Sequence, residues 1–169
     1  TAQRSLESAP QPGVTLVEPS LPVDPEGVIY DTVSRQPLAG AQVALVGPAG
    51  FTPATQLLGG ATNATQTTDA TGAYQFLLLP GAPAGTYTLS IVPPAGYNAP
   101  SAFLPPSGTL DPTGQGVNGV LRVQAQNVPP SGAQPFTYYL TLSLAPGDPD
   151  LVNNHVPLDP AVLQGGAIR

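Results

Sequence analysis

Short stretches in which apolar and polar residues alternate, separated by clusters of proline and glycine, run through most of this 169-residue sequence. The clearest is FTYYLTLSL, residues 136–144. A period of two places successive side chains on opposite faces of a strand, whereas an amphipathic helix needs a period near 3.6 residues. Because the 23 prolines and 19 glycines fall mostly between these stretches, the pattern predicts an all-β fold in the form of a β-sandwich.

The remaining stretches that predict strands vary in length and regularity. They are residues 27–31, 41–47, 55–58, 73–79, 86–92, 101–106 and 119–126. Of these, 55–58 is expected to be a short edge strand. The only weak candidate for a helix is 159–166, which would form at most two turns. We therefore expect about seven or more strands joined by long loops rich in proline and glycine.

The sequence divides into a linker, one domain and a short tail. Residues 1–25 contain five prolines and no lasting period, which is typical of an extended linker or arm. One β-sandwich domain is expected over residues 26–160, with additional strands and loops in its second half, 98–160. Residues 161–169 are expected to form a linker to a following domain.

Charge is scarce and its sign is negative. Only 8% of residues are charged, the net charge is −6, and the four basic residues, all arginines, are scattered along the chain. Without a basic patch, nucleic acid and anionic membrane surfaces are not expected as partners. No apolar run approaches the ~18 residues that a membrane-spanning helix needs, so we expect no membrane insertion within this chain.

The composition also favours a location outside the cell. The chain has no cysteine, so neither disulfide nor thiolate chemistry is expected. It also has no methionine, even at position 1, which indicates a piece of a longer chain. Low charge combined with much Thr, Ser, Ala, Gly and Pro is typical of cell-surface modules. We expect an extracellular or outer-surface module that is exported as part of a longer chain.

Two motifs carry a resemblance to a known family. Residues 27–45, GVIYDTVSRQPLAGAQVAL, are followed at 67–97 by TTDATGAYQFLLLPGAPAGTYTLSIVPPAGY. Together they resemble the carboxypeptidase-regulatory-like and SdrD B-like domains of large Gram-negative surface proteins. The resemblance covers 27–97 and implies an Ig-like or transthyretin-like (prealbumin-like) β-sandwich, used as a repeat module. It implies little about function, because such domains are accessory or stalk parts of unrelated proteins.

The sequence departs from this family in two ways. Some SdrD B-like domains bind Ca²⁺ through an acidic loop after the first strand, but here Asp31 is followed by TVSRQ, without a further carboxylate. The Lys–Asn isopeptide crosslink of related collagen-adhesin repeats cannot form within this chain, because the chain has no lysine. The resemblance therefore implies the fold without these two features.

Acidic and amide side chains gather at two places. Asp69, in TDATG, is typical of a turn in which the carboxylate accepts backbone N–H bonds and Gly72 supplies a positive φ. The stretch GDPDLVNN supplies the best candidate ligands for a hard cation such as Ca²⁺, namely Asp148, Asp150, Asn153 and Asn154. The alternative for this stretch is a hydrogen-bonded turn that closes the last strand.

No combination of residues predicts an enzyme. His155 is the only histidine, so a zinc site is not expected. A Ser-His-Asp triad is not expected either, because the sequence lacks Gly-x-Ser-x-Gly. Glycoside hydrolysis by a pair of carboxylates is not expected either, because the three glutamates lie at positions 7, 18 and 26, in or beside the predicted linker. We therefore expect no catalytic residues and no cofactor other than the candidate Ca²⁺.

The leading hypothesis is a non-enzymatic structural, stalk or assembly module of a bacterial cell-surface protein, with neighbouring domains or copies of that protein as partners. In one variant it is a filament or surface-layer subunit, and residues 14–18, VTLVE, add as a strand to the next subunit. One alternative is an adhesion module for a glycan or a host protein, which would use loops 98–118 and 127–135 and outward-facing Tyr97 and Tyr139. A further alternative is an accessory domain of a secreted enzyme.

Overall fold

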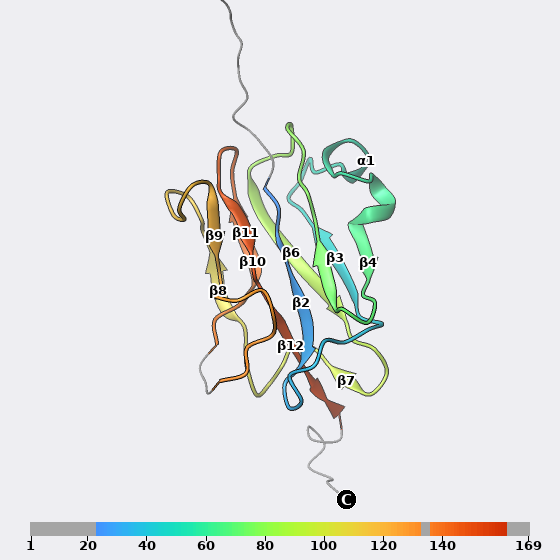
Figure 1. The fold of residues 1–169 in the computed structure, drawn as a ribbon. Coiled ribbons are helices and arrows are strands. Elements are labelled where there is room, and N and C mark those ends of the chain that lie inside the picture. Colours follow the sequence, from blue (N-terminus) through green and yellow to red (C-terminus); the bar gives the residue numbers. More distant parts are fainter. Residues whose placement is uncertain (1–22, 133–135, 162–169) are drawn as a thin grey trace, which may run out of the picture.

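The computed structural model describes residues 23–132 and 136–161, which form a β-sandwich (Figure 1). One sheet has five strands in the order β4 (Thr65–Thr67), β3 (Gln42–Val46), β6 (Gly85–Val92), β10 (Tyr139–Leu144) and β8 (Ser107–Leu110). The other has the order β5 (Ala73–Gln75), β2 (Glu26–Asp31), β12 (Val156–Pro160) and β7 (Tyr97–Asn98). The predicted all-β sandwich is confirmed.

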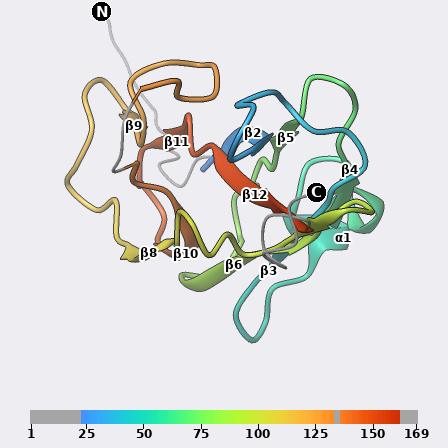
Figure 2. The same ribbon diagram turned by 90° about the horizontal axis from the view of Figure 1, so that it is seen from below.

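Three smaller elements complete the described chain. A parallel two-stranded ribbon joins β9 (Val120–Arg122) to β11 (Asp150–Val152). A short α1 (Pro53–Gln56) and a 3-10 helix η2 (Ala61–Ala64) lie between β3 and β4 in the chain. Seen from one end, the strands β8, β10, β6 and β3 form one layer, and β2 and β12 form the other (Figure 2).

The predicted alternation separates the core from the surface. On β3 the inward side chains Val43 and Leu45 are buried, whereas Gln42 and Val46 are exposed. The same alternation buries Tyr87 and Leu89 on β6, Leu142 and Leu144 on β10, and Tyr74, Phe76 and Leu78 along the segment that begins with β5. Each large apolar side chain buried in this way contributes roughly 1.5–3 kcal/mol, so the two facing layers drive folding.

Several predicted strands differ from the structure, and of the predicted strand 73–79 only Ala73–Gln75 (β5) is a strand. Residues 53–56 form α1 because Pro53 occupies the first turn of the helix, where its missing N–H costs nothing. Only Leu57 pairs as a bridge, with Leu78. Residues 101–104 form a loop, and β8 begins only at Ser107, after two prolines that cannot donate to a ladder. In the stretch 119–126 only 120–122 is a strand.

The ends of the domain fall partly outside the described residues. Residues 159 and 160 belong to β12, and the rest of the predicted helix 159–166, from 162 on, lies outside the described residues, as do residues 14–18. At the other end, Leu78 donates its N–H to the carbonyl of Val23 at 2.9 Å, and Phe76 donates to Pro25 at 3.0 Å. The packed domain therefore includes residues that the sequence pattern assigned to the linker.

The outer edge of the segment 73–79 is covered by other groups. The side-chain amide of Gln66 bonds both backbone groups of Gln75: its Oε1 accepts the N–H at 3.1 Å, and its Nε2 donates to the carbonyl. Further along, Leu58 donates to the carbonyl of Leu77, and Leu79 donates to that of Gln56. In the five-stranded sheet, the edge strand β8 is only four residues long and has prolines on both sides. Such short or covered edges resist pairing with another chain.

The first and last described strands are parallel neighbours. Ile29 of β2 lies opposite Val156 of β12, and Asp31 lies opposite Leu158. The described chain enters the sandwich beside the start of β2 and leaves it after β12, at the opposite end (Figure 1). A pull on both ends of the chain therefore slides these two strands along each other.

The contact between Gly27 and the segment before β12 supplies a test of the fold. A Cβ on Gly27 would lie 2.2 Å from the carbonyl oxygen of Asn154, whereas a Cβ on Gly108 would have no atom within 4 Å. Overpacking of this kind costs about 1–3 kcal/mol. We expect Gly27→Ala to lose that amount of unfolding free energy in urea denaturation and Gly108→Ala to be nearly neutral. Equal stabilities for the two variants would contradict the close approach.

Candidate functional site

Three consecutive polar residues between β11 and β12 are buried in the sandwich. Asn153, Asn154 and His155 are only 5%, 1% and 1% exposed. Buried polar groups are costly unless they are hydrogen-bonded, and each of these side chains has partners on other elements. We call Asn153–His155 the polar segment; it is the densest set of buried polar side chains in the described chain.

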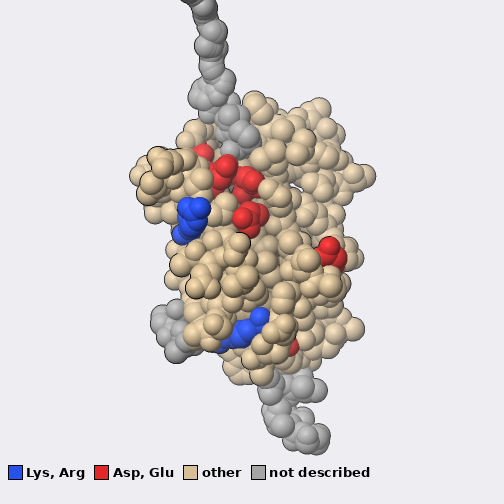
Figure 3. Space-filling model, in the orientation of Figure 1, with Lys and Arg blue, Asp and Glu red and all other residues tan. Residues whose placement is uncertain are grey.

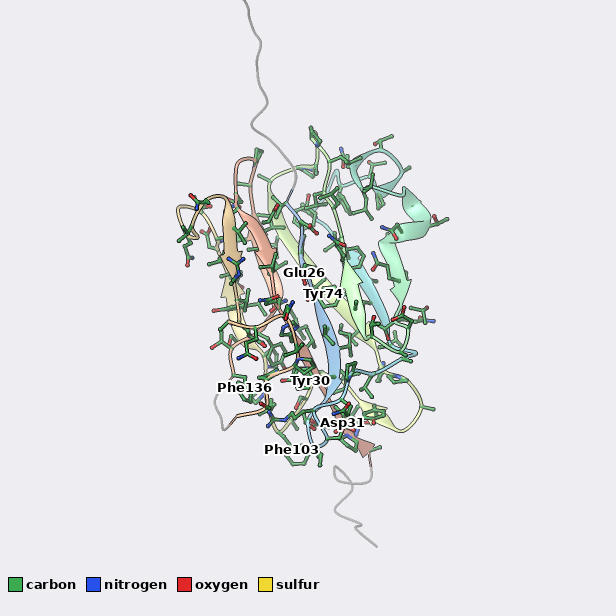
Figure 4. The ribbon with its side chains drawn as sticks, viewed as in Figure 1. Glu26, Tyr30, Asp31, Tyr74, Phe103 and Phe136 are labelled. Carbon is green, nitrogen blue, oxygen red and sulfur yellow. The ribbon has the colours of Figure 1, made fainter. Side chains whose placement is uncertain are left out.

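Asn154 joins three elements. Its Oδ1 accepts the N–H of Tyr139 at 2.9 Å, and its Nδ2 donates to the carbonyl of Tyr139 at 2.8 Å, so the side chain replaces a neighbouring strand for β10. Its own N–H donates to the carbonyl of Glu26 at 3.0 Å, and its carbonyl accepts the hydroxyl of Tyr74 at 2.6 Å. Figure 4 shows Tyr74 and Glu26 close together beside β2. Burial raises the pKa of Tyr74 far above its ordinary value.

His155 is held as a neutral ring. Its Nδ1 lies 3.1 Å from the backbone nitrogen of Val28 and accepts that N–H. Its Nε2 lies 2.8 Å from the carbonyl oxygen of Gln126, and only a protonated Nε2 can donate there. The neutral tautomer with hydrogen on Nε2 satisfies both contacts. Burial lowers the pKa of His155, and the Gln126 carbonyl opposes that shift.

Asn153 and Gln124 extend these contacts to the β9 side. Asn153, whose φ is 61°, donates its Nδ2 to the carbonyl of Gln124 at 3.1 Å. Gln124 donates its Nε2 to the carbonyl of Thr137 at 3.0 Å and to that of His155 at 3.1 Å. The polar segment thus connects the small ribbon, the start of β10 and the start of β2.

The four residues predicted as cation ligands lie in different parts of the structure and do not share one site. Asp148 accepts the N–H of Ala145 at 2.7 Å and the hydroxyl of Thr113 at 3.0 Å, which closes the turn after β10. Asp150 lies on β11, while Asn153 and Asn154 belong to the polar segment described above. Among residues 23–132 and 136–161, no three His, Cys, Asp or Glu side chains are grouped to hold a metal ion. Calcium binding remains a prediction.

A different group of carboxylates lies at the start of β2. Asp24, Glu26 and Asp150 are partly buried, and burial is the main cause that raises the pKa of each. The charge of Asp24 further raises the pKa values of the other two. Figure 3 shows acidic side chains gathered on this face. Because the folded state holds these protons more tightly than the unfolded state does, the three groups lower stability at neutral pH and cease to do so in acid.

The predicted turn at Asp69 is present in the structure. The carboxylate of Asp69 accepts the N–H of Thr71 at 2.9 Å and also its hydroxyl, which lowers the pKa of Asp69, and Gly72 has φ +69°. This confirms the predicted turn. Asp31 makes a similar turn, in which its Oδ1 accepts the N–H of Val33 at 2.7 Å.

The expected outward-facing tyrosines are not free. The hydroxyl of Tyr97 donates to Oδ2 of Asp31 at 2.7 Å, and this bond is the main reason that its pKa rises to about 12. Tyr139 is half-buried and packs against the core from β10, in the other sheet. Both tyrosines are thus partly buried and lie in different sheets, so they do not form one exposed aromatic cluster.

The described parts of the two long loops are tied to the sandwich. Arg35 donates to the carbonyl of Pro130 at 2.6 Å, and its guanidinium lies 5.0 Å from the ring centre of Phe136. The fully buried carboxylate of Asp159 on β12 accepts the N–H of Ala102 at 2.6 Å and the hydroxyl of Ser101. These contacts fix the backbone at the start of the loop 98–118 and in the loop 127–135, of which residues 133–135 lie outside the described part.

Two open hollows flank the polar segment. One, of about 370 Å³, is lined by Val123, Gln124, Val128 and Phe136, among others. The other, of about 510 Å³, is lined by Glu26, Arg122 and Asn153, among others. Among the described residues, the lining of the first hollow includes hydroxyl groups but no Asp, Glu or His, and the lining of the second includes Glu26 but no Ser, Thr or Cys, so neither pairs a nucleophile with a base.

No family model matches the chain, and no curated protein matches it. Within the described residues, no helix is long and apolar enough to cross a membrane.

The role of Asp148 can be tested in the presence and absence of calcium. Asp148 is buried, and its loss would leave the N–H of Ala145 and the hydroxyl of Thr113 without this acceptor, which costs about 1–3 kcal/mol. We expect Asp148→Ala to lose this stability in thermal denaturation equally with EDTA and with added Ca²⁺. The exposed turn variant Asp69→Ala is the control and should lose less. A calcium-dependent rise in melting temperature, present in the wild type and absent in Asp148→Ala, would instead establish a cation site.

Proposed function

We propose that this chain is a non-enzymatic structural module that acts as a spacer in a bacterial cell-surface protein. The observation that carries the proposal is the parallel pairing of β2 with β12, with the chain entering and leaving at opposite ends. Modules joined end to end through such termini extend in line, and each linker transmits force to the next module.

Tension between the two ends acts on the β2–β12 pair in shear. Shear loads all the backbone hydrogen bonds of the pair at the same time. Pulling the two strands apart at one end would instead break the bonds one after another. The bonds from Asn154 to Glu26 and from His155 to Val28 lie just before the ladder and share the load. This arrangement favours a module that resists extension.

The edges favour a spacer over a subunit that exchanges strands. Gln66 occupies the backbone groups of Gln75, and β8 is short and enclosed by prolines. At the β5 and β8 edges, these features leave little backbone for strand addition. The described parts of loops 98–118 and 127–135 are hydrogen-bonded to the sandwich, and the hydroxyl of Tyr97 is bonded to Asp31. These contacts give no support to a surface that binds a glycan or a host protein.

The location rests on composition and resemblance. A chain with 8% charged residues and no cysteine, similar over residues 27–97 to carboxypeptidase-regulatory-like and SdrD B-like domains, fits the exported stalk of a surface protein. Both ring nitrogens of the only histidine serve the fold, which supports a role without catalysis.

Single-molecule force spectroscopy tests the proposal. The chain has no native cysteine, so handles can be placed at chosen sites. We expect a high rupture force when the protein is pulled through its two termini. The comparison is a Val33→Cys/Ala161→Cys variant, in which both handles lie beside the same ends of β2 and β12, and the strands unzip at a force several times lower.

The control for this comparison is the unfolding free energy of the doubly substituted protein in urea, which should match that of the wild type. Val33 is exposed and follows β2, so its substitution should disturb little. Equal rupture forces in the two directions would exclude a module built to resist extension.

A further inference from the structure

We propose that the hollow between the start of β2 and the β9–β11 ribbon binds a short zwitterionic peptide, whose free carboxylate pairs with Arg122 and whose free ammonium pairs with Glu26. Both side chains line this hollow of about 510 Å³, which we call the ribbon hollow. Its volume lies within the range of small-molecule sites. The proposal is independent of the spacer role, because it concerns the side of one module and not its ends.

The lining of the ribbon hollow combines apolar and amide side chains. Val120 and Val152 come from the two strands of the ribbon, and Gln126 and Asn127 come from the loop after β9. Ligand sites in proteins commonly join apolar lining to a few polar groups that fix the orientation of the ligand. The small apolar side chains and the backbone amides of a peptide thus both find partners here.

The two charged residues of the lining have opposite signs and do not pair with each other. Glu26 is half-buried at the start of β2, and Arg122 is exposed at the end of β9. Both line the hollow, yet within the described residues no ion pair joins them. Figure 3 shows a basic side chain beside the acidic group on this face, with uncharged surface between them. The hollow therefore presents one charge of each sign.

This arrangement of charges is complementary to a ligand that also carries both signs. The planar donors of a guanidinium match the two oxygens of a carboxylate. On the other side, an ammonium near Glu26 also gains from the neighbouring charges of Asp24 and Asp150. A simple anion or cation would leave one side of the hollow without a partner. A peptide with free ends satisfies both sides, and its amides can bond Gln126 and Asn127.

The backbone around the ribbon hollow is fixed by bonds within the domain. The carbonyl of Gln126 lies 2.8 Å from Nε2 of His155, and the carbonyl of Glu26 accepts the N–H of Asn154 at 3.0 Å. Arg122 is held on β9 by the parallel pairing with β11. Only the ends of the lining side chains remain to be ordered when a ligand binds, which keeps the entropic cost of binding low.

NMR titration of the isotope-labelled full chain with trialanine tests the proposal. We expect saturable shifts of the amide signals of Arg122, Gln126 and Asn127, with a dissociation constant on the order of millimolar, because exposed ion pairs each contribute little. N-acetyl-trialanine lacks the ammonium and trialanine amide lacks the carboxylate, so each should bind up to about fivefold more weakly. Shifts that do not saturate, or a blocked peptide that binds as tightly as trialanine, would overturn the proposal.

Two charge variants assign the ends of the peptide. In Arg122→Gln, trialanine and its amide should bind equally, and in Glu26→Gln, trialanine and its acetylated form should bind equally. Arg122 is exposed and makes no hydrogen bond within the described residues, so its variant should match the wild type in urea denaturation. Asp111→Asn removes an exposed carboxylate that does not line the hollow and is the control, which should keep both preferences. A preference for the free carboxylate that persists in Arg122→Gln would contradict the assigned site.

Discussion

The parallel pairing of β2 with β12 is the constraint on which the rest of this structure depends. Parallel neighbours cannot be joined by a hairpin, so the chain between Asp31 and Val156 must build the opposite sheet before it returns. That sheet supplies the facing apolar layer of β3, β6 and β10. The same pairing places the two ends of the described chain at opposite ends of the sandwich, which is the basis of the proposed spacer role.

The junction between these strands is polar just before the ladder begins at Ile29 and Val156. Asn154 and His155 replace strand partners for Tyr139 and Val28 with side-chain groups, and Gly27 leaves the space that the Asn154 carbonyl needs. A buried hydrogen-bonded network of this kind disfavours any other pairing, because a shifted register would leave several buried groups without partners.

Much of the sandwich could be predicted from the sequence, because its strands bury one face and expose the other. The alternation in residues 41–47, 86–92 and 136–144 follows from that burial, because every second side chain faces the core. The alternation is misleading where proline determines the local backbone. Pro53 lies in the first turn of a helix, and β8 begins only after the two prolines at 105 and 106.

The polar segment was harder to interpret from the sequence. The oxygen atoms of Asn153 and Asn154 suit a cation, yet the hydrogen bonds of these side chains go to groups that sequence spacing cannot reveal. The hydroxyl of Tyr74 lies 80 residues away from Asn154 in the sequence, and the Val28 amide lies 127 residues away from His155. The one available signal was the run of polar residues directly before the apolar Val156, since a strand that continues into the core must bury what precedes it.

Native-state hydrogen exchange tests most directly the claim that this junction holds the fold together. The amides to follow are those of Val28, Asn154 and Tyr139, which donate to His155, Glu26 and Asn154. We predict that all three exchange only through global unfolding, so that their protection free energies equal the unfolding free energy from urea denaturation. Exchange of these amides through local opening, at a free energy well below the global value, would contradict the account.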